Sequence, residues 1–290
     1  MIIPVKQPVT LLELLFAEFG SASKTTVKKI ISHGNIRIND VVERNPSTKV
    51  IPDDQVEYIK ERPVGKKEAT PFPLLYEDRD LLVTVKPPGL LIYGDRGTGG
   101  TSLYKILSDF IKERSEGKER LFVVHRLDRE VSGIVMFAKQ ERIQQALKNH
   151  WNQVTKKYYA LVEGRPSEKA GTIRTYLAEN SKQRVHSANN QEGAKLAITH
   201  YTVLKELPDH TLLEITLATG RKNQIRVHLS EMGCPVVGDR RYGADDTFIR
   251  RIRLHASFLS FQHPESNVRL EYNLPIPKGF LSLKEGDEKY

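Results

Sequence analysis

The chain has 290 residues and a formal net charge of +9, with 39% hydrophobic and 8% aromatic residues, a composition that fits a folded protein of one large and one small domain. Its only cysteine, Cys234, excludes an intrachain disulfide and a cysteine-based zinc site, and no run approaches the roughly 18 apolar residues of a membrane-spanning helix. The first ten residues lack the features of a signal peptide, so we expect a cytoplasmic protein without a membrane segment. The positive net charge indicates that the protein binds a polyanionic partner.

Residues 1–60 are expected to form a separate small module. A capping box of Thr10 and Glu13 opens an apolar helix that Gly20 ends, and a second helix is predicted over residues 24–32. Short alternating runs after these helices predict strands. The module therefore has two helices followed by strands.

The second helix of this module carries the first candidates for contacts with the phosphates of a polyanionic partner. Lys24 and Lys28 are four residues apart and share a helix face, with Lys29 beside them, and Arg37 lies in the strand that follows. A solvated helix face is the alternative explanation, because the module contains 8 basic and 7 acidic residues and is almost neutral.

Residues 61–72 are polar, contain two prolines and one glycine, and are expected to link the module to a second domain over residues 73–290. In that domain Thr101 is predicted to cap an amphipathic helix, and a second amphipathic helix is predicted over residues 140–151. Most of the remaining sequence has the alternation of strands. Many strands with few helices predict an α+β domain, in which helices flank a mostly antiparallel mixed sheet.

A charged loop between two apolar runs, at 121–124 and 133–138, is the most informative feature of this domain. Both runs are rich in β-branched and aromatic residues and are typical of buried strands, so the loop is expected at the rim of a sheet. Asp128 lies two residues from Arg126 and next to Arg129, and nearby cations favour its ionised form. It can serve as a nucleophile or merely form a structural ion pair, and the local pattern fits both equally.

The segment HRLDREVSG, residues 125–133, resembles the HRLDxxTSG signature of the RluA-type family of RNA pseudouridine synthases. Val131 stands where the family usually has threonine, a change that affects only how the loop is hydrogen-bonded. The resemblance implies that Asp128 is the catalytic residue, acting on the sugar or on the base of a uridine. It also implies that Arg126 fills the space left by the extruded base, and we expect His125 to be structural. The first module, by its order of two helices and short strands, resembles an S4-type RNA-binding module, which often precedes the catalytic domain in this family.

A second segment, KYYALVEG at 157–164, resembles the family pattern K-x-Y-x-A-x-V-x-G. Strand alternation places Tyr158, Ala160 and Val162 on one face and Tyr159 on the other. The resemblance implies that Tyr158 stacks on the target base, as aromatic side chains commonly do with unpaired bases. A core tyrosine is the alternative explanation, and Tyr159 is the alternative stacking residue.

A third segment, TGRKNQIRVH at 219–228, joins a strand to a basic helical start and resembles the family motif TGRxHQIRxH. The resemblance implies that Arg226 pairs with Asp128, and a guanidinium can hold a carboxylate in bidentate geometry. Arg226 and His228 cannot both face the sheet from a regular helix, so separate roles are expected. Asn223 replaces the usual histidine, which leaves the role of that side chain open.

Two further segments match the family in order, GDRRYG at 238–243 and RLHA at 253–256, and both are expected to be scaffold around the site. Basic residues concentrate at 139–200, with 11 basic and 5 acidic residues, and at 220–255, with 8 and 4. These clusters predict RNA phosphate contacts, for which Arg221 and Lys222 are candidates.

These features predict an RNA pseudouridine synthase that needs no cofactor or metal, since the sequence contains no nucleotide-binding glycine motif and no metal-ligand spacing. We expect large-subunit ribosomal RNA as the substrate, transfer RNA as the alternative, and a monomeric protein. A glycoside hydrolase is the rival enzyme, but it needs two opposed carboxylates, and only Glu130 lies near Asp128. A non-catalytic RNA-binding or ribosome-assembly protein is the other rival.

Overall fold

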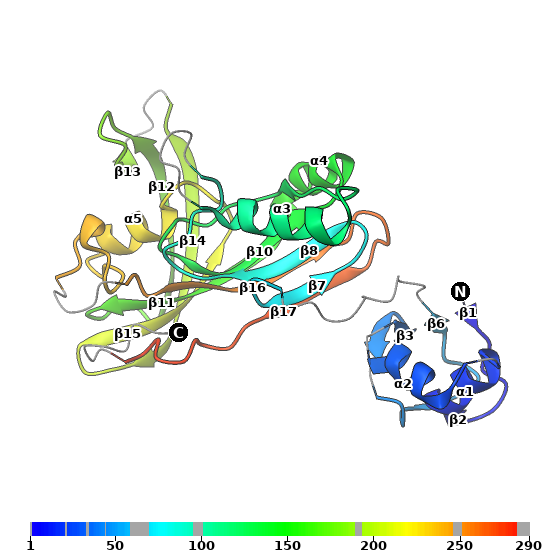
Figure 1. The fold of residues 1–290 in the computed structure, drawn as a ribbon. Helices are drawn as coiled ribbons and strands as arrows, with labels where there is room; N and C mark the ends of the chain where they lie inside the picture. Colours follow the sequence, from blue (N-terminus) through cyan, green and yellow to red (C-terminus); the bar gives the residue numbers. More distant parts are fainter. Residues whose placement is uncertain are drawn as a thin grey trace. The chain divides into compact units, whose positions relative to one another are not determined.

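The structure is a computed structural model (Figure 1). It describes residues 2–20, 22–32, 35–43, 45–58, 70–94, 101–188, 193–245 and 251–282. The chain divides into two compact units, Met1–Glu68 and Ala69–Tyr290. Most of the predicted linker at 61–72, and the glycine-rich stretch at 95–100, lie outside the described residues. Within the described part of the chain, no helix is long and apolar enough to cross a membrane.

The first unit packs two helices against short strands. Its elements are β1 (Ile2–Ile3), β2 (Val9–Thr10), α1 (Leu11–Glu18), α2 (Lys24–Ser32), β3 (Ile36–Ile38), β4 (Val41–Glu43), β5 (Lys49–Val50) and β6 (Val56–Tyr58). The sheet has the order β1-β6-β3-β4, and β2 pairs with β5. The predicted capping box is confirmed, because the Thr10 hydroxyl accepts from the Glu13 N–H and the Glu13 carboxylate accepts from the Thr10 N–H at 2.9 Å.

The second unit is built on one large sheet. Its strands are β7 (Leu74–Glu77), β8 (Leu81–Lys86), β9 (Phe122–Val123), β10 (Ser132–Ala138), β11 (Thr155–Glu163), β12 (Ala170–Glu179), β13 (Val185–Ala188), β14 (Lys195–Glu206), β15 (His210–Leu217), β16 (Leu254–Gln262) and β17 (Arg269–Asn273). The order along the sheet is β13-β12-β14-β15-β11-β16-β10-β8-β7, with β17 paired to β16 and β9 to β10. Every pairing is antiparallel except that of β10 with β16, which confirms the predicted α+β class.

Three helices flank this sheet, α3 (Leu103–Arg114) and α4 (Glu141–Asn149) near the β7–β8 end and α5 (Gln224–Glu231) near the β12–β13 end (Figure 1). The 3₁₀ turns η1 (Trp151–Gln153) and η2 (Arg240–Tyr242) complete the elements. Alternation along β10 sorts its side chains: Ile134 and Met136 pack with α4, whereas Val135 and Phe137 pack with α3. Because α5 also contributes to the cluster that contains α3, these two helices cover the same face of the sheet.

The helix start predicted at Thr101 is wrong by one residue. The N-cap of α3 is Ser102, whose hydroxyl accepts a hydrogen bond from the Lys105 N–H at 3.2 Å. Two hydroxyl residues stand side by side in the sequence, and only the position of the first helical turn decides which of them caps it.

Candidate active site

The loop between β9 and β10 is fastened to the core on both sides of Asp128. Leu127 and Val131 are buried in the main hydrophobic cluster, and the Val131 N–H donates to the Asp128 carbonyl at 3.2 Å. Val131 therefore stabilises the loop through packing and a backbone turn, without the hydroxyl that threonine would supply. The Asp128 side chain remains 22% exposed, so a substrate can reach it at the rim predicted from the sequence.

The exit of this loop is fixed by close contact between two parallel strands. Ser132 and Gly133 of β10 pair with His255 and Ala256 of β16, and the Ser132 hydroxyl lies 2.8 Å from Nδ1 of His255. Gly133 has a φ of +121°, and a Cβ atom there would lie 2.2 Å from the Ala256 carbonyl oxygen. Only glycine permits this approach.

A fully buried lysine at the end of β8 holds the other side of the loop. The Lys86 ammonium donates to the carbonyls of Pro87, Leu90 and Arg129, at 2.9, 2.7 and 2.9 Å. Burial lowers the pKa of Lys86 to about 7, and the negative charges of Glu130 and Asp128 oppose that shift. All three donors are satisfied, so Lys86 fixes the loop backbone.

Arg226, on α5, reaches Asp128 from a distant part of the sequence. Its Nη1 lies 3.5 Å from Oδ2 of Asp128 and 4.0 Å from Oε2 of Glu130. Its bidentate contact, however, is with Asp239, whose carboxylate oxygens accept from Nε at 2.6 Å and from Nη2 at 2.8 Å. The predicted proximity of Arg226 to Asp128 is present, but the fork geometry expected for that pair is directed to Asp239 instead.

Further contacts hold the guanidinium in place. Asn223 has a left-handed backbone with φ of 53°, accepts from Nη1 of Arg226 at 3.1 Å and donates to the Tyr242 hydroxyl at 3.0 Å. The Tyr242 ring lies 5.0 Å from the Arg226 guanidinium carbon. Asn223 thus has a definite structural role, and His228 has a separate one, since its ring nitrogens bond to Thr199 and Thr175.

Burial governs the ionisation of Asp128. It raises the pKa of this carboxyl above its ordinary value, while Arg226 and Arg126 lower it and Glu130 raises it. The two arginines therefore offset only part of the effect of desolvation on the pKa of Asp128. The sequence-based expectation that neighbouring cations keep Asp128 ionised does not account for this burial. A carboxylate that is costly to ionise and only partly compensated is suited to react.

Tyr158 lies on the face of β11 that contributes to the main cluster, together with Ala160 and Val162. Tyr159 packs in a different cluster, so the predicted alternation of this strand is confirmed. Burial, and the nearby negative charge of Asp128, raise the pKa of the Tyr158 hydroxyl, which is therefore neutral. Tyr158 and Asp128 thus lie within electrostatic range of each other on one face of the sheet.

A cavity of about 210 Å³ adjoins Tyr158. It is lined by Val124, His125, Arg126, Trp151, Lys156, Tyr158, Leu217 and Gly220. Burial and the charge of Lys156 lower the pKa of His125 to about 3, and its Nε2 accepts from the Met136 N–H at 3.0 Å. His125 is a neutral structural residue, whereas Arg126 is exposed at the cavity.

The residues predicted to contact phosphates differ in how far they are exposed. Arg221 is exposed and donates from Nε to the Leu196 carbonyl at 3.0 Å, and Lys222 pairs with Glu179. In the first unit Lys24 and Lys28 are exposed on α2, while the side chain of Lys29 lies outside the described residues. The Arg37 side chain is only 11% exposed and lies 4.0 Å from Glu57, so it is directed inward rather than toward a partner.

Sequence reasoning missed Asp239 and Lys86. Asp239 lies in the GDRRYG segment, which was expected to be scaffold, yet it makes the strongest contact to Arg226. The available signal was an acidic residue inside a segment that matches the family in order. For Lys86 the signal was a lysine at the end of an apolar strand, immediately before Pro87-Pro88-Gly89.

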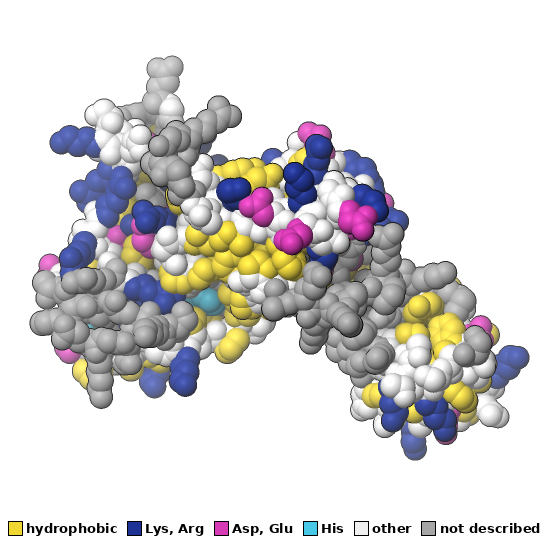
Figure 2. All heavy atoms as spheres, viewed as in Figure 1, with side chains coloured by type: hydrophobic (Ala, Val, Ile, Leu, Met, Phe, Trp, Pro, Cys, Tyr) yellow, Lys and Arg dark blue, Asp and Glu magenta, His cyan; other side chains and the backbone are white. Residues whose placement is uncertain are grey.

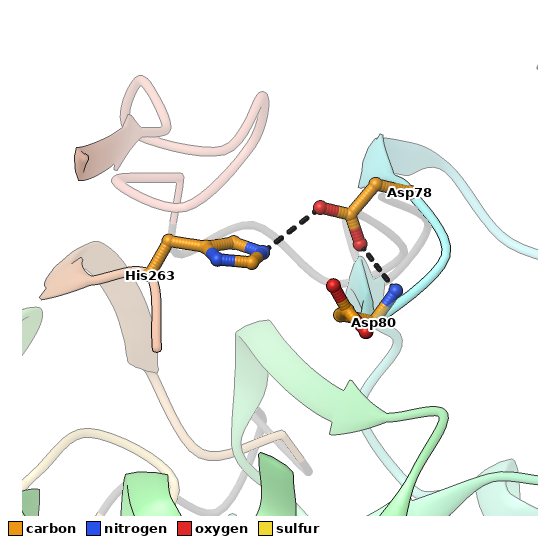
Figure 3. A group of neighbouring side chains, drawn as sticks. All are labelled: Asp78, Asp80 and His263. Carbon is orange, nitrogen blue, oxygen red and sulfur yellow. Dashed lines mark hydrogen bonds and ion pairs between the residues drawn. The ribbon is translucent and has the colours of Figure 1, made fainter. Parts of the chain in front are cut away.

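One group of potential metal ligands occurs among the described residues, Asp78, Asp80 and His263 (Figure 3). Nδ1 of His263 accepts from backbone N–H groups, which fixes the proton on Nε2, and this nitrogen donates to Asp78 at 2.9 Å. The oxygens of Asp80 accept from Arg79 at 3.0 Å and from Gln140 at 2.7 Å. Every ligand atom is already engaged, so this group is a hydrogen-bonded link between the β7–β8 turn and the end of β16.

The geometry also argues against a glycoside hydrolase. Asp128 and Glu130 approach the same nitrogen of Arg226, at 3.5 and 4.0 Å. Both carboxylates are thus engaged by one guanidinium, whereas a glycoside hydrolase needs its two carboxyl groups free to flank the glycosidic bond.

Comparison with known proteins agrees with this arrangement. Residues 80–231 match the family described as RNA pseudouridylate synthase, and residues 10–56 match the S4 domain. The chain belongs to the RluA-type family of RNA pseudouridine synthases, which confirms the resemblance seen in its motifs. It is therefore an isomerase that converts uridine in RNA to pseudouridine, and it carries an S4 RNA-binding domain.

Individual relatives are similar over most of their length. The chain is 34% identical to YlyB, an uncharacterized RNA pseudouridine synthase of Bacillus subtilis, over 92% of this chain and 90% of that protein. It is 30% identical to ribosomal large subunit pseudouridine synthase D of Escherichia coli, over 92% and 87%. Among solved structures, human RNA pseudouridylate synthase domain containing 4 matches with a TM-score of 0.60 and 26% identity, over 72% and 90%.

Proposed function

We propose that this protein isomerises specific uridines of large-subunit ribosomal RNA, with Asp128 as the essential carboxylate, Arg226 as its charged partner and Tyr158 as the ring that stacks on the uracil. The observation that carries this proposal is the 3.5 Å contact between Arg226 and Asp128, on the sheet face that also presents Tyr158. The ribosomal substrate is supported by the Escherichia coli relative, whose name specifies the large ribosomal subunit.

The overall chemistry explains why we expect no cofactor. Uridine and pseudouridine are isomers: the N1–C1′ bond breaks, the C5–C1′ bond forms, a proton leaves C5 and a proton is gained at N1. Electrons balance without an oxidant or a reductant. The isomerisation needs three kinds of protein group. These are a carboxylate that acts on the sugar or on the base, a cation that controls its charge, and an aromatic ring that holds the detached base.

The charge distribution supports a large RNA partner. Figure 2 shows Lys and Arg side chains gathered over the end of the catalytic unit that carries β12, β13 and α5. Exposed residues there include Lys182, Arg184, Lys195 and Arg221. Cations spread over such a surface neutralise backbone phosphates without reading sequence. Arg126, exposed beside the loop, is proposed to enter the helix as the base leaves it.

Tritium release tests the activity directly. Unmodified large-subunit ribosomal RNA and transfer RNA, each transcribed with uridine labelled at C5, are incubated with the protein, and both tritium release and pseudouridine positions are measured. We expect release from ribosomal RNA, which Asp128→Asn abolishes while RNA binding is retained. Asp109→Asn is the matched control, because Asp109 is an exposed carboxylate on α3 that pairs only with Lys105 at 3.0 Å. Turnover by Asp128→Asn would refute the assignment, and modification of transfer RNA alone would change the substrate.

The S4 domain is proposed to bind RNA through α2. Replacing Lys24 and Lys28 together by alanine is expected to weaken binding and to lower the slope of log affinity against log salt by up to about 1.8, roughly 0.7–0.9 for each lost phosphate contact. Lys6 and Lys49 are exposed in the same unit, so their double alanine variant is a control of equal charge. Equal slopes for the two double variants would exclude α2 as the contact surface.

A further inference from the structure

Three lysines are buried among the described residues, and they differ in how their ammonium groups are satisfied. Lys86 donates to three backbone carbonyls. Lys139 lies 2.6 Å from Glu77 and 3.1 Å from Glu119. Lys156 is 8% exposed and has neither a hydrogen-bond acceptor nor a carboxylate within ion-pair distance in the described part of the chain. The side chain is therefore largely buried, while its ammonium stays accessible at the cavity, where water or an anion can reach it. Such a cation is compensated best by an anion.

The compensation inside the protein is incomplete. The Lys156 ammonium lies 5.3 Å from the centre of the Trp151 ring, a cation–π contact. Such a contact offsets part of the lost hydration, but it satisfies none of the three N–H donors in the way an anion does. The nearby His125 is neutral and accepts from a backbone N–H, so it supplies no negative charge.

The position of Lys156 indicates which ligand pairs with its ammonium. Lys156 and Tyr158 alternate onto the same face of β11, and both line the cavity of about 210 Å³ together with Arg126. This cavity therefore combines the ammonium of a largely buried lysine, an exposed guanidinium and the ring assigned to the uracil. The ammonium of Lys156 is a donor that suits phosphate oxygens.

We propose that Lys156 binds one backbone phosphate of the RNA, adjacent to the nucleotide whose base stacks on Tyr158, while Arg126, which lines the same cavity, enters the helix in place of that base. The site holds the extruded nucleotide by its phosphate while the base is detached and turned. Lys156 is a substrate-binding residue in this scheme. The identity of the RNA rests on the proposed function above, but the existence of the phosphate site does not.

The neighbouring lysine provides a matched control. Lys157 is on the opposite face of β11, where its ammonium lies 3.0 Å from Glu214 and 5.8 Å from the Phe258 ring. Lys156→Met and Lys157→Met therefore make the same change of charge and size one residue apart. Lys156→Arg keeps the charge.

The first test measures binding of an unmodified large-subunit ribosomal RNA transcript at several salt concentrations, in an Asp128→Asn background that removes turnover. Lys156→Met is expected to raise Kd about tenfold or more and to lower the salt slope by about 0.7–0.9, whereas Lys157→Met leaves the slope unchanged and Lys156→Arg largely restores it. Equal slopes for Lys156→Met and Lys157→Met overturn the proposal. If the wild-type protein forms no pseudouridine but this difference persists, the proposed function fails and the phosphate site stands.

Thermal unfolding separates a binding role from a structural one. Methionine fills the same space without a buried charge, so Lys156→Met is expected to unfold at the wild-type temperature or a few degrees above it. A fall in Tm together with weaker binding would mean that Lys156 stabilises the fold.

A second measurement uses RNA oligonucleotides that span a modified uridine, each with one phosphate replaced by a methylphosphonate. The replacement at one position should weaken binding to the wild-type protein but not to Lys156→Met. Equal sensitivity of both proteins at every position overturns the proposal.

Discussion

The contact between Arg226 and Asp239 provides the sharpest test of how the candidate site is organised. Asp239 is 1% exposed and holds Arg226 through two short hydrogen bonds, at 2.6 and 2.8 Å. Asp239→Asn removes the charge and places an amide N–H₂ against a guanidinium donor. Breaking a buried pair costs about 3–5 kcal/mol, and because Arg226 keeps Asp128 and Asn223 we expect the lower end, about 3 kcal/mol. For a unit of this size that is a fall in Tm of about 6–12 °C.

The same substitution should change catalysis in a way that a purely structural defect does not. Without its bidentate contact to Asp239, the Arg226 guanidinium can shift relative to Asp128. A displacement of about 1 Å can reduce turnover about a hundredfold. Losing the negative charge of Asp239 also leaves Arg226 freer to stabilise the Asp128 carboxylate, so the pKa of Asp128 should fall.

Urea unfolding, single-turnover tritium release and the pH profile of kcat/KM together decide the case for Asp239→Asn. We expect a lower unfolding free energy, a reduced kcat and an acid limb displaced to lower pH. Asp245→Asn, in the same loop and exposed, is the control and should resemble the wild type. Wild-type turnover and an unmoved acid limb in Asp239→Asn would refute a positioning role, whatever happens to stability.

Four further outcomes are expected. Because burial raises the pKa of Asp128, kcat/KM should fall with decreasing pH already above the ordinary carboxyl range near about 4, and an acid limb below that range would contradict this. The raised pKa means that the folded state binds the Asp128 proton more tightly than the unfolded state does. The stability of the fold therefore decreases as pH rises through this raised pKa. At neutral pH, Asp128→Asn should have the wild-type Tm or a higher one. Tyr158→Phe should retain kcat/KM within about tenfold while Tyr158→Leu loses about ten- to a hundredfold more, as expected for stacking worth about 1–3 kcal/mol; equal losses would point to the hydroxyl instead. Gly133→Ala should destabilise the fold by about 3 kcal/mol or more, since the new Cβ meets the Ala256 carbonyl at 2.2 Å, whereas Gly20→Ala, with open space, should melt like the wild type.

Local periodicity and motif order were enough to predict much of this protein. The capping box at Thr10 and Glu13, the alternation that separates Tyr158 from Tyr159, and the α+β class follow from side chains within a few residues of one another. The ordered motifs identified the family for the same reason, because they are read along the chain.

Contacts between distant segments are a different matter, since the sequence specifies which groups exist but not which of them meet. Arg226 could be matched with a carboxylate from its motif, yet only the packing of α5 against the 238–243 loop directs its fork to Asp239 and leaves one nitrogen for Asp128. Arg37 illustrates the same limit, because a strand position alone did not show that its side chain turns inward toward Glu57.

Burial is the quantity that the tertiary structure decided. Within the sequence Lys156 and Lys157 are adjacent and equivalent, and Asp128 is simply an aspartate between arginines. In the folded protein most of the Lys156 side chain is buried and Lys157 pairs with Glu214, while desolvation outweighs the arginines at Asp128. The sequence by itself determined the family and indicated the groups that are proposed to react. The tertiary structure decided their charges and partners, because solvation depends on what surrounds a group in space rather than on its neighbours along the chain.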